Sequence, residues 1–415
     1  QQAQGSKAPV QRIADRIASV FVPTVIGLSA LTFVLWLVIG GEAYFSHALL
    51  SAVSVLVIAC PCALGLATPT ALMVGIGRGA ENQILIKDAA ALEQMCRIDT
   101  MVLDKTGTLT EGRPSVTEWI DVVPPSDGLY DAVYSAEMKS EHPLASAVTA
   151  YLAGRGARRR EVDSFESLTG RGIAFRCDGA SYWIGSRALL ETRDVRPSVE
   201  LLARIDRLEQ EGAGTVFVGQ DDRLLSVVVV SDPLKETTRE ALEQLRRRHI
   251  RLVMLTGDNR RAAAALAGRL GIDDFRAEMM PDDKEQYVRR LQAEGRRVAM
   301  TGDGINDSQA LARADVSIAM GRGTDVAMDV AMITLMNSDL SLLPKAYALS
   351  RSTVRLIREN LFWAFVYNLI GIPIAAGALY PLCGLLLSPM LAGAAMAFSS
   401  VSVVANSLRL KWKKL

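Results

Sequence analysis

Three blocks of this 415-residue chain contain no Asp, Glu, Lys or Arg, and they constrain the fold more than any other feature. They run from Val20 to Gly41, from Ala43 to Gly77 and from Leu361 to Leu408. A helix needs about 20 apolar residues to cross a bilayer, so the first two blocks predict one span each. The third is too long for one span and is expected to turn near Tyr380-Pro381. Buried helices of a soluble core could explain one such block but not three, so we expect a multi-pass membrane protein with four transmembrane helices.

Basic residues flank these predicted spans on one side only. Those before the first span are Lys7, Arg12 and Arg16, and those after the last are Arg409, Lys411, Lys413 and Lys414. The connectors near Gly41 and Pro381 carry no Lys or Arg. By the positive-inside rule, both termini and the segment from Arg78 to Asn360 are therefore expected in the cytoplasm. Because 46 Lys and Arg face 45 Asp and Glu, no nucleic-acid partner is expected.

The second predicted span contains Cys60-Pro61-Cys62 and then Pro69. Proline removes a helical hydrogen bond and clashes with the preceding turn, so the helix should be kinked or unwound there. Irregular backbone at membrane depth is tolerated only where it faces protein or a wet cavity. The two thiolates are soft ligands suited to Cu(I) and, less selectively, to Zn(II). Two small cysteines that only pack the helix are the alternative.

The last two spans offer further candidate metal ligands. Tyr367 and Asn368 lie in the third span, and Met396 and Ser400 lie in the fourth. Each of them alone is explained by helix packing, since small and polar residues let membrane helices approach closely. Together with the two cysteines they form a thiolate, thioether and amide set without a carboxylate. Such a set favours a soft monovalent ion over a hard divalent one.

In the long cytoplasmic segment, apolar runs end in polar residues of a catalytic type. The run 100–103 leads into 104–110 (Asp-Lys-Thr-Gly-Thr-Leu-Thr), 251–255 leads into Thr256-Gly-Asp258, and 297–300 leads into 301–307 (Thr-Gly-Asp-Gly-Ile-Asn-Asp). Further apolar runs at 316–320 and 332–336 alternate with helical patterns such as 237–248 and 260–270. This alternation predicts a doubly wound parallel sheet with ligands beyond the carboxyl ends of its strands. We therefore expect Asp104, Thr256 and Asp303 to converge.

Phosphoryl-transfer chemistry assigns roles to these residues. Asp104 is the expected nucleophile toward phosphorus, and the turn after it should hold phosphoryl oxygens. Mg²⁺, a hard cation that prefers oxygen ligands, is expected on Asp104, Thr106 and Asp303. The remaining candidate catalytic residues contact the phosphoryl group or support the metal: Lys105, Thr256, Asp258, Lys284, Asn306 and Asp307. An Asp that merely starts a turn is the alternative for Asp104.

These strings resemble the signatures of the copper(I)-transporting heavy-metal P-type ATPases. The matching strings are the phosphorylation sequence 104–110, Cys60-Pro-Cys62, Tyr367-Asn368 and Met396-x-x-Ser-Ser400. Zinc-type relatives share Cys-Pro-Cys but carry a lysine and an aspartate in the later spans, which this chain lacks. The resemblance implies ATP-driven export of Cu(I) or Ag(I) through an aspartyl-phosphate, with ATP and Mg²⁺ as cofactors. A Zn(II)- or Cd(II)-transporting P-type ATPase is the alternative.

Two further readings belong to other classes of protein. One is a membrane-anchored phosphatase that uses the same aspartate. Soluble phosphatases of the haloacid-dehalogenase-like superfamily usually place a general-acid aspartate where this chain has Thr106, which argues against that reading. The other is a metal-binding membrane module without activity, and the intact set of Asp104, Thr256, Lys284 and Asp303 argues against it.

Between about residues 111 and 227 the pattern changes to a helix near 132–152 and short strands near 172–176, 182–185 and 215–218. This predicts a small α+β domain inserted into the phosphorylation domain. The resemblance implies that it binds ATP through Glu137, His142, Pro143, Gly170, Gly172 and Gly185. Ser186 stands where the family often has Asn. Without the resemblance, His142-Pro143 would be interpreted as a surface turn.

The predicted fold class is multi-domain α/β plus an α-helical membrane part, with a haloacid-dehalogenase-like doubly wound parallel sheet, the inserted α+β nucleotide-binding domain and four transmembrane helices. The expected segments are 1–99 (two spans and a linker), 100–110 and 228–340 (phosphorylation domain), 111–227 (nucleotide-binding domain) and 341–415 (two spans). Family members carry further helices and an actuator domain before this region, so we expect a fragment. Asp15 matches a carboxylate where the ion enters in relatives, or simply starts a helix. The resemblance also implies a copper chaperone as partner and location in the plasma membrane.

Overall fold

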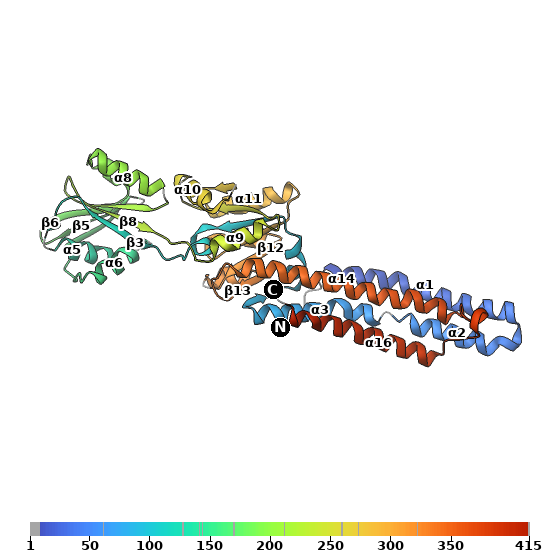
Figure 1. Ribbon diagram of the computed structural model, residues 1–415. Coiled ribbons are helices and arrows are strands. Elements are labelled where there is room, and N and C mark those ends of the chain that lie inside the picture. The colour runs from blue at the N-terminus through green and yellow to red at the C-terminus, as the bar shows by residue number, and fades with distance from the viewer. Residues whose placement is uncertain are drawn as a thin grey trace.

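The structure is a computed structural model that describes residues 9–413 except 61, 127, 141, 143, 169–170, 211, 259, 273 and 322; for residues 9–18, 62 and 305 it describes the backbone only. Three parts follow one another along an elongated molecule (Figure 1). A six-stranded sheet lies at one end, a seven-stranded sheet lies in the middle, and long helices extend to the other end. The predicted combination of α/β domains with membrane helices is confirmed.

The seven-stranded sheet has the order β1-β13-β12-β11-β2-β9-β10. Its strands are β1 (Ile84–Ile86), β2 (Thr100–Asp104), β9 (Arg251–Leu255), β10 (Asp274–Arg276), β11 (Val298–Gly302), β12 (Val316–Met320) and β13 (Ile333–Leu335). All neighbours are parallel except β1 and β13, so the predicted parallel sheet is confirmed with one antiparallel strand at its edge. The helices that connect the strands are α4 (Ala89–Gln94), α9 (Thr238–Arg246), α10 (Arg260–Leu270), α11 (Pro281–Ala293), α12 (Ser308–Arg313) and α13 (Asp325–Val330).

Strand β2 lies at the centre of this sheet and is buried along its whole length. Met101 and Leu103 belong to one hydrophobic cluster, and Val102 belongs to another. Successive side chains of a strand point to opposite faces, so the two clusters cover the two faces of the sheet. A strand buried in this way fixes the position of Asp104 at its carboxyl end.

The six-stranded sheet is antiparallel throughout, with the order β3-β8-β7-β6-β5-β4. Its strands are β3 (Ser115–Asp121), β4 (Ser164–Leu168), β5 (Gly172–Cys177), β6 (Ala180–Gly185), β7 (Gly214–Gln220) and β8 (Arg223–Ser231). Its helices are α5 (Leu129–Glu137), α6 (Ala145–Gly154), α7 (Arg187–Thr192) and α8 (Val199–Gln210). β8 continues beyond residue 227, so this sheet extends past the end of the predicted segment.

The helix predicted near residues 132–152 is two helices, α5 and α6, and that prediction was wrong in this respect. Residues 138–144 separate them and contain His142. A proline at 143 disfavours helical backbone in the residue before it, which explains the interruption. His142 consequently lies in a loop between two helix ends and not within a helix.

The long helices are α1 (Pro9–Gly40), α2 (Phe45–Ile58), α3 (Cys62–Glu81), α14 (Leu342–Ala375) and α16 (Pro389–Leu408), with the short α15 (Tyr380–Cys383) near one end of the bundle. In the described part of the chain, three helical stretches are long and apolar enough to cross a membrane: Ser19–Gly40, Glu42–Glu81 and Pro389–Trp412. The predicted third span is the second half of α14, where the charge-free part of the helix runs only from Leu361 to Ala375. It packs against α2, α3 and α16 and exposes apolar side chains such as Leu369. Its crossing of the membrane stays a prediction.

The helix of the second predicted span is interrupted at Cys60-Pro61-Cys62. α2 ends at Ile58 and α3 begins at Cys62, so the break predicted from the proline is confirmed. α3 continues through Pro69 without interruption. The described backbone is therefore non-helical next to Cys60, between α2 and α3.

Candidate functional site

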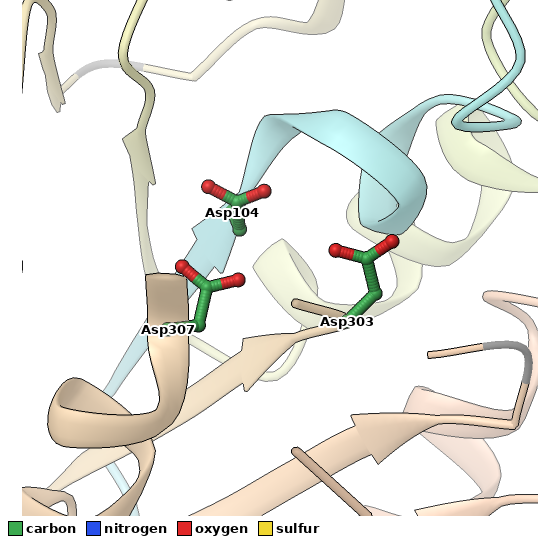
Figure 2. Close-up of side chains that lie close together, drawn as sticks. All are labelled: Asp104, Asp303 and Asp307. Atoms are coloured by element: carbon green, nitrogen blue, oxygen red, sulfur yellow. The ribbon is translucent and has the colours of Figure 1, made fainter. Parts of the chain in front are cut away.

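Three aspartates meet at the carboxyl ends of the central strands (Figure 2). Asp104 ends β2, Asp303 follows β11, and Asp307 lies one turn further on. One carboxylate oxygen from each lies within 4.8 Å of those from the other two. Carboxylate oxygens so close together are suited to a hard divalent cation such as Mg²⁺. Asp307, expected only to support the metal, is thus placed as a direct ligand candidate, whereas the side chain of Thr106 is exposed.

Lys284, near the start of α11, joins two of these carboxylates. Its Nζ donates hydrogen bonds to Asp104 Oδ1 at 2.6 Å and to Asp307 Oδ1 at 2.7 Å. All three side chains are at most 7% exposed. Removing one partner from such a buried group leaves an uncompensated charge, so the ammonium and the two carboxylates depend on one another.

The electrostatic environment shifts the pKa values of these groups. Burial, reinforced by the neighbouring Asp307 carboxylate, raises the pKa of Asp104 to about 7, although Lys284 opposes the shift. Burial and Asp307 likewise raise the pKa of Asp303 to about 6. Burial lowers the pKa of Lys284, but Asp104 and Asp307 raise it more, so its net direction is upward. A site that concentrates this much negative charge is prepared for a cation.

The turn after Asp104 depends on a glycine at position 107. Gly107 has φ +70°, and a Cβ built on it would lie 1.5 Å from Asp303 Oδ2. Any side chain here would therefore both strain the backbone and displace a proposed metal ligand. The glycine lets the Asp104 loop and the Asp303 carboxylate approach each other.

Lys105 and Asp258, both predicted as catalytic, form an ion pair at the rim of the site. The backbone N–H of Asp258 donates to Thr256 Oγ1 at 3.1 Å, and Thr256 itself is buried. The structure thus connects the loop after β9 with the loop after β2. Asn306, the remaining candidate, is exposed.

Two residues that the sequence analysis did not predict form hydrogen bonds with the loop after Asp104. Lys235 is 5% exposed, and its Nζ donates to the carbonyl oxygen of Gly107. Asp232 Oδ2 accepts a hydrogen bond from Thr110 Oγ1 at 2.6 Å. Both residues follow β8, which belongs to the other sheet. An internal lysine two residues after an Asp-Pro pair was the available signal, but a solvated lysine would look the same in sequence.

A cavity of about 660 Å³ lies against the six-stranded sheet. Glu137, His142, Gly172 and Gly185, all predicted to bind nucleotide, line it together with Ser186. Residues that the prediction missed complete the wall, including Lys139, Phe165 and Arg171. The volume is typical of a pocket for a nucleotide-sized ligand. Pro143 and Gly170 lie outside the described residues.

The two predicted glycines in this cavity have a structural role of their own. Gly172 and Gly185 face each other across β5 and β6. A Cβ on Gly172 would lie 2.1 Å from the carbonyl oxygen of Ile184, and one on Gly185 would lie 2.3 Å from that of Arg171. Close contact between strands therefore explains both glycines without reference to a ligand.

In the membrane part, the break at Cys60 and the predicted ligands of the later helices belong to one packed region. Cys60 packs against a hydrophobic cluster that contains Met396. Asn368 and Ser399 are 7% and 1% exposed, and within the described residues Asn368 Oδ1 and Ser399 Oγ have no hydrogen-bond partner. Ser399, rather than the predicted Ser400, is the more buried of the two serines. Buried polar atoms without partners are costly, so a ligand between these helices would stabilise them.

Four of the residues predicted for metal binding or ion entry need further comment. Tyr367 is 36% exposed and is the least enclosed of the predicted ligands whose side chains the structure describes. Only a reduced thiol can bind a soft metal, so the proposed role of Cys60 requires its thiol form. The side chains of Cys62 and Asp15 lie outside the described residues.

The fold and the aspartate site agree with what comparison with known proteins shows. A family model described as haloacid dehalogenase-like hydrolase matches residues 98–315, which include Asp104, Lys284, Asp303 and Asp307. The chain therefore belongs to the haloacid dehalogenase-like hydrolases.

Within that class, the resemblance to copper-transporting P-type ATPases is confirmed. The chain is 48% identical to a copper-exporting P-type ATPase of Legionella pneumophila over 99% of this chain and 55% of the relative. It is also 48% identical to a silver exporting P-type ATPase of Salmonella typhimurium over 100% of this chain and 50% of the relative. The crystal structure of a zinc-transporting PIB-type ATPase in the E2.Pi state superimposes with a TM-score of 0.82 at 32% identity, covering 98% of this chain and 65% of that one. The chain thus spans about half the length of the curated relatives it matches.

Proposed function

We propose that this chain carries the phosphorylation, nucleotide-binding and ion-binding parts of a P-type ATPase that exports Cu(I), or Ag(I), across a membrane. The observation that carries the proposal is the meeting of Asp104, Lys284, Asp303 and Asp307 at the ends of the central strands. Sequence relatives named copper- and silver-exporting ATPases support the choice of ion.

In this proposal Asp104 Oδ attacks the terminal phosphorus of ATP, the bond to the bridging oxygen breaks, and ADP leaves with that electron pair. The Lys284 ammonium hydrogen-bonds the Asp104 carboxylate and stabilises negative charge on the phosphoryl oxygens. Thr256, in the loop after β9, contacts the phosphoryl group as well. Mg²⁺, when bound by Asp104, Asp303 and Asp307, neutralises charge on the transferred group. Lys105 and Asp258 fix the two loops relative to each other.

The ATP base and ribose would occupy the cavity beside Glu137, His142 and Ser186. The ion would bind where the helix is broken at Cys60, with Cys62, Asn368 and Met396 as further ligands. Thiolate and thioether ligands without a carboxylate favour Cu(I) over Zn(II). The basic residues that flank the helices support a cytoplasmic position for both sheets by the positive-inside rule. The proposed location is the plasma membrane, and the proposed donor of the ion is a copper chaperone.

A Zn(II) transporter is the second candidate, because the superimposable solved structure is a zinc-transporting ATPase. Phosphorylation from labelled ATP, measured in the presence of reduced Cu(I), Ag(I) or Zn(II), separates the two. Stimulation by Cu(I) and Ag(I), with Asp104→Asn as a blank and exposed Asp222→Asn as the matched control, is the expected result. Stimulation by Zn(II) alone would replace the copper proposal, and undiminished labelling of Asp104→Asn would remove the aspartate from its role.

A further inference from the structure

The end of α1 and the start of α2 lie at the end of the helix bundle farthest from the two sheets (Figure 1). Four aromatic rings form a cluster there. The ring of His47 is at its centre. The centroid of that ring lies 5.8 Å from Trp36, 5.1 Å from Tyr44 and 5.7 Å from Tyr380. The imidazole is thus surrounded by three aromatic side chains from different segments.

Two buried polar atoms in this region lack partners. Within the described part of the chain, His47 Nδ1 and Ser51 Oγ are shielded from solvent and make no hydrogen bond. Ser51 is 1% exposed. The two residues are four apart on α2, so they lie on the same face of that helix. A buried donor or acceptor without a partner costs free energy, and a ligand at this face would remove that cost.

The surroundings favour one kind of ligand. A cavity of about 600 Å³ adjoins the cluster, and Trp36, Tyr44 and Tyr380 are among the residues that line it. No carboxylate is among its described lining residues. Trp36 is held in place because its Nε1 donates to the carbonyl oxygen of Ala376 at 3.0 Å and its indole covers Gly377.

Imidazole nitrogen is a good ligand for copper-type ions, and aromatic faces attract cations, most strongly the face of tryptophan. A hard divalent cation prefers carboxylate oxygens, and the described lining of the cavity contains none.

We propose that His47, with Ser51 and the ring of Trp36, forms a second binding station for the soft monovalent cation on the release side of the membrane. The inference rests on the proposed function, because the ion must first pass the break at Cys60. Position 47 precedes Cys60 by about 20 Å of helix. One imidazole and aromatic faces bind a soft cation less tightly than two thiolates do. The ion would therefore pass from the tighter site at Cys60 to the weaker site at His47, from which it can dissociate.

The test uses Ag(I) as the probe and the whole chain, purified in lipid nanodiscs, in a Cys60→Ser/Cys62→Ser/Cys383→Ser background. Cys383 is removed because it is an exposed thiol on α15, at the same end of the bundle. Tryptophan fluorescence is recorded during titration, and the signal of Trp36 is taken as the difference from a Trp36→Phe chain. His47→Asn removes the imidazole, and His249→Asn is the matched control, since His249 is exposed in the loop between α9 and β9. His47→Phe keeps a ring in the cluster but has no Nδ1.

We expect Ag(I) to quench Trp36, and both His47 variants to shift the midpoint at least tenfold to higher Ag(I), while His249→Asn leaves it unchanged. If Ag(I) does not change the fluorescence of Trp36, or if His47→Phe leaves the midpoint unchanged, the proposed site at His47 is wrong. Ag(I)-stimulated phosphorylation of the unsubstituted chain is measured in parallel. If that stimulation is present and Trp36 is silent, the station fails and the proposed function stands. If it is absent and Trp36 responds through His47, the metal station stands and the transport proposal fails.

Discussion

Lys284 balances the charge of two buried carboxylates at the ends of the central strands. Its substitution by Met would leave Asp104 and Asp307 facing each other without a cation. We expect the free energy of unfolding to fall by about 3–5 kcal/mol and phosphorylation from ATP to slow by about 10²-fold. Thermal unfolding and a labelled-ATP assay measure the two effects. Lys284→Arg keeps the charge and should retain most of the stability, so equal destabilisation by Arg and Met would contradict this account.

Glu137, in the cavity against the six-stranded sheet, predicts a pH dependence of stability. Burial raises its pKa from 4.5 to about 7, against a hydrogen bond from Ser140 that lowers it. The folded state therefore keeps a proton that the unfolded state has lost, and stability falls as pH rises from 4.5 to 7. Glu137→Gln removes this loss, so its advantage over the parent chain should grow by about 2 kcal/mol between pH 5.5 and pH 8.

Thermal unfolding of the two chains at both pH values is the measurement. Glu166→Gln serves as the control, because Glu166 is exposed on β4 of the same sheet. An advantage that does not change with pH would show that the Glu137 carboxylate is already compensated in the folded state.

At the scale of elements, the turn after β2 tolerates only glycine at position 107. Gly107→Ala would place a methyl group against Asp303 in a backbone conformation that alanine avoids. Gly179→Ala is the matched control, since Gly179 has φ +76° but nothing within 4 Å of its Cβ position. We expect the control to lose about 1 kcal/mol and Gly107→Ala to lose Mg²⁺-dependent phosphorylation as well. Phosphorylation assayed over a range of Mg²⁺ concentrations tests this, and normal Mg²⁺ dependence in Gly107→Ala would refute the role of the close contact.

The sequence predicted the sheet around Asp104 because its strands are continuous apolar runs that end in polar residues, a pattern that buried parallel strands produce. It did not predict β1, whose three residues are too short to show a period, or β3 and β4, whose partly exposed residues show no clear alternation. The separation of α5 and α6 depends on the loop around His142, which an apolar pattern on both sides conceals. Lys235 and Asp232 were missed for another reason. Their contacts with the Asp104 loop arise only when two segments distant in sequence fold together.

At the scale of the whole molecule, the cavity proposed for the nucleotide and the broken helix lie in different parts of an elongated structure (Figure 1). Substitutions at the two places should therefore have separable effects. Cys60→Ser should abolish stoichiometric binding of Cu(I) and leave the affinity for ATP within about twofold of that of the unsubstituted chain. His142→Ala should weaken ATP binding and leave Cu(I) binding and phosphorylation from inorganic phosphate unchanged. Equilibrium binding of Cu(I) and of ATP to each variant tests this prediction. If either variant loses binding of both ligands, the two sites do not behave independently.

α14 joins the two parts as one uninterrupted rod. Its first half packs into the core of the seven-stranded sheet through Leu343, Leu349 and Ile357, and its second half carries Asn368 beside the broken helix. From Leu342 to Asn368 the helix measures about 39 Å. A tilt of about 5° at the sheet would swing Asn368 sideways by about 3 Å. That distance exceeds the length of a metal–ligand bond. Under the proposed function, a small rotation of the phosphorylated domain would therefore break the contact between Asn368 and an ion bound beside it.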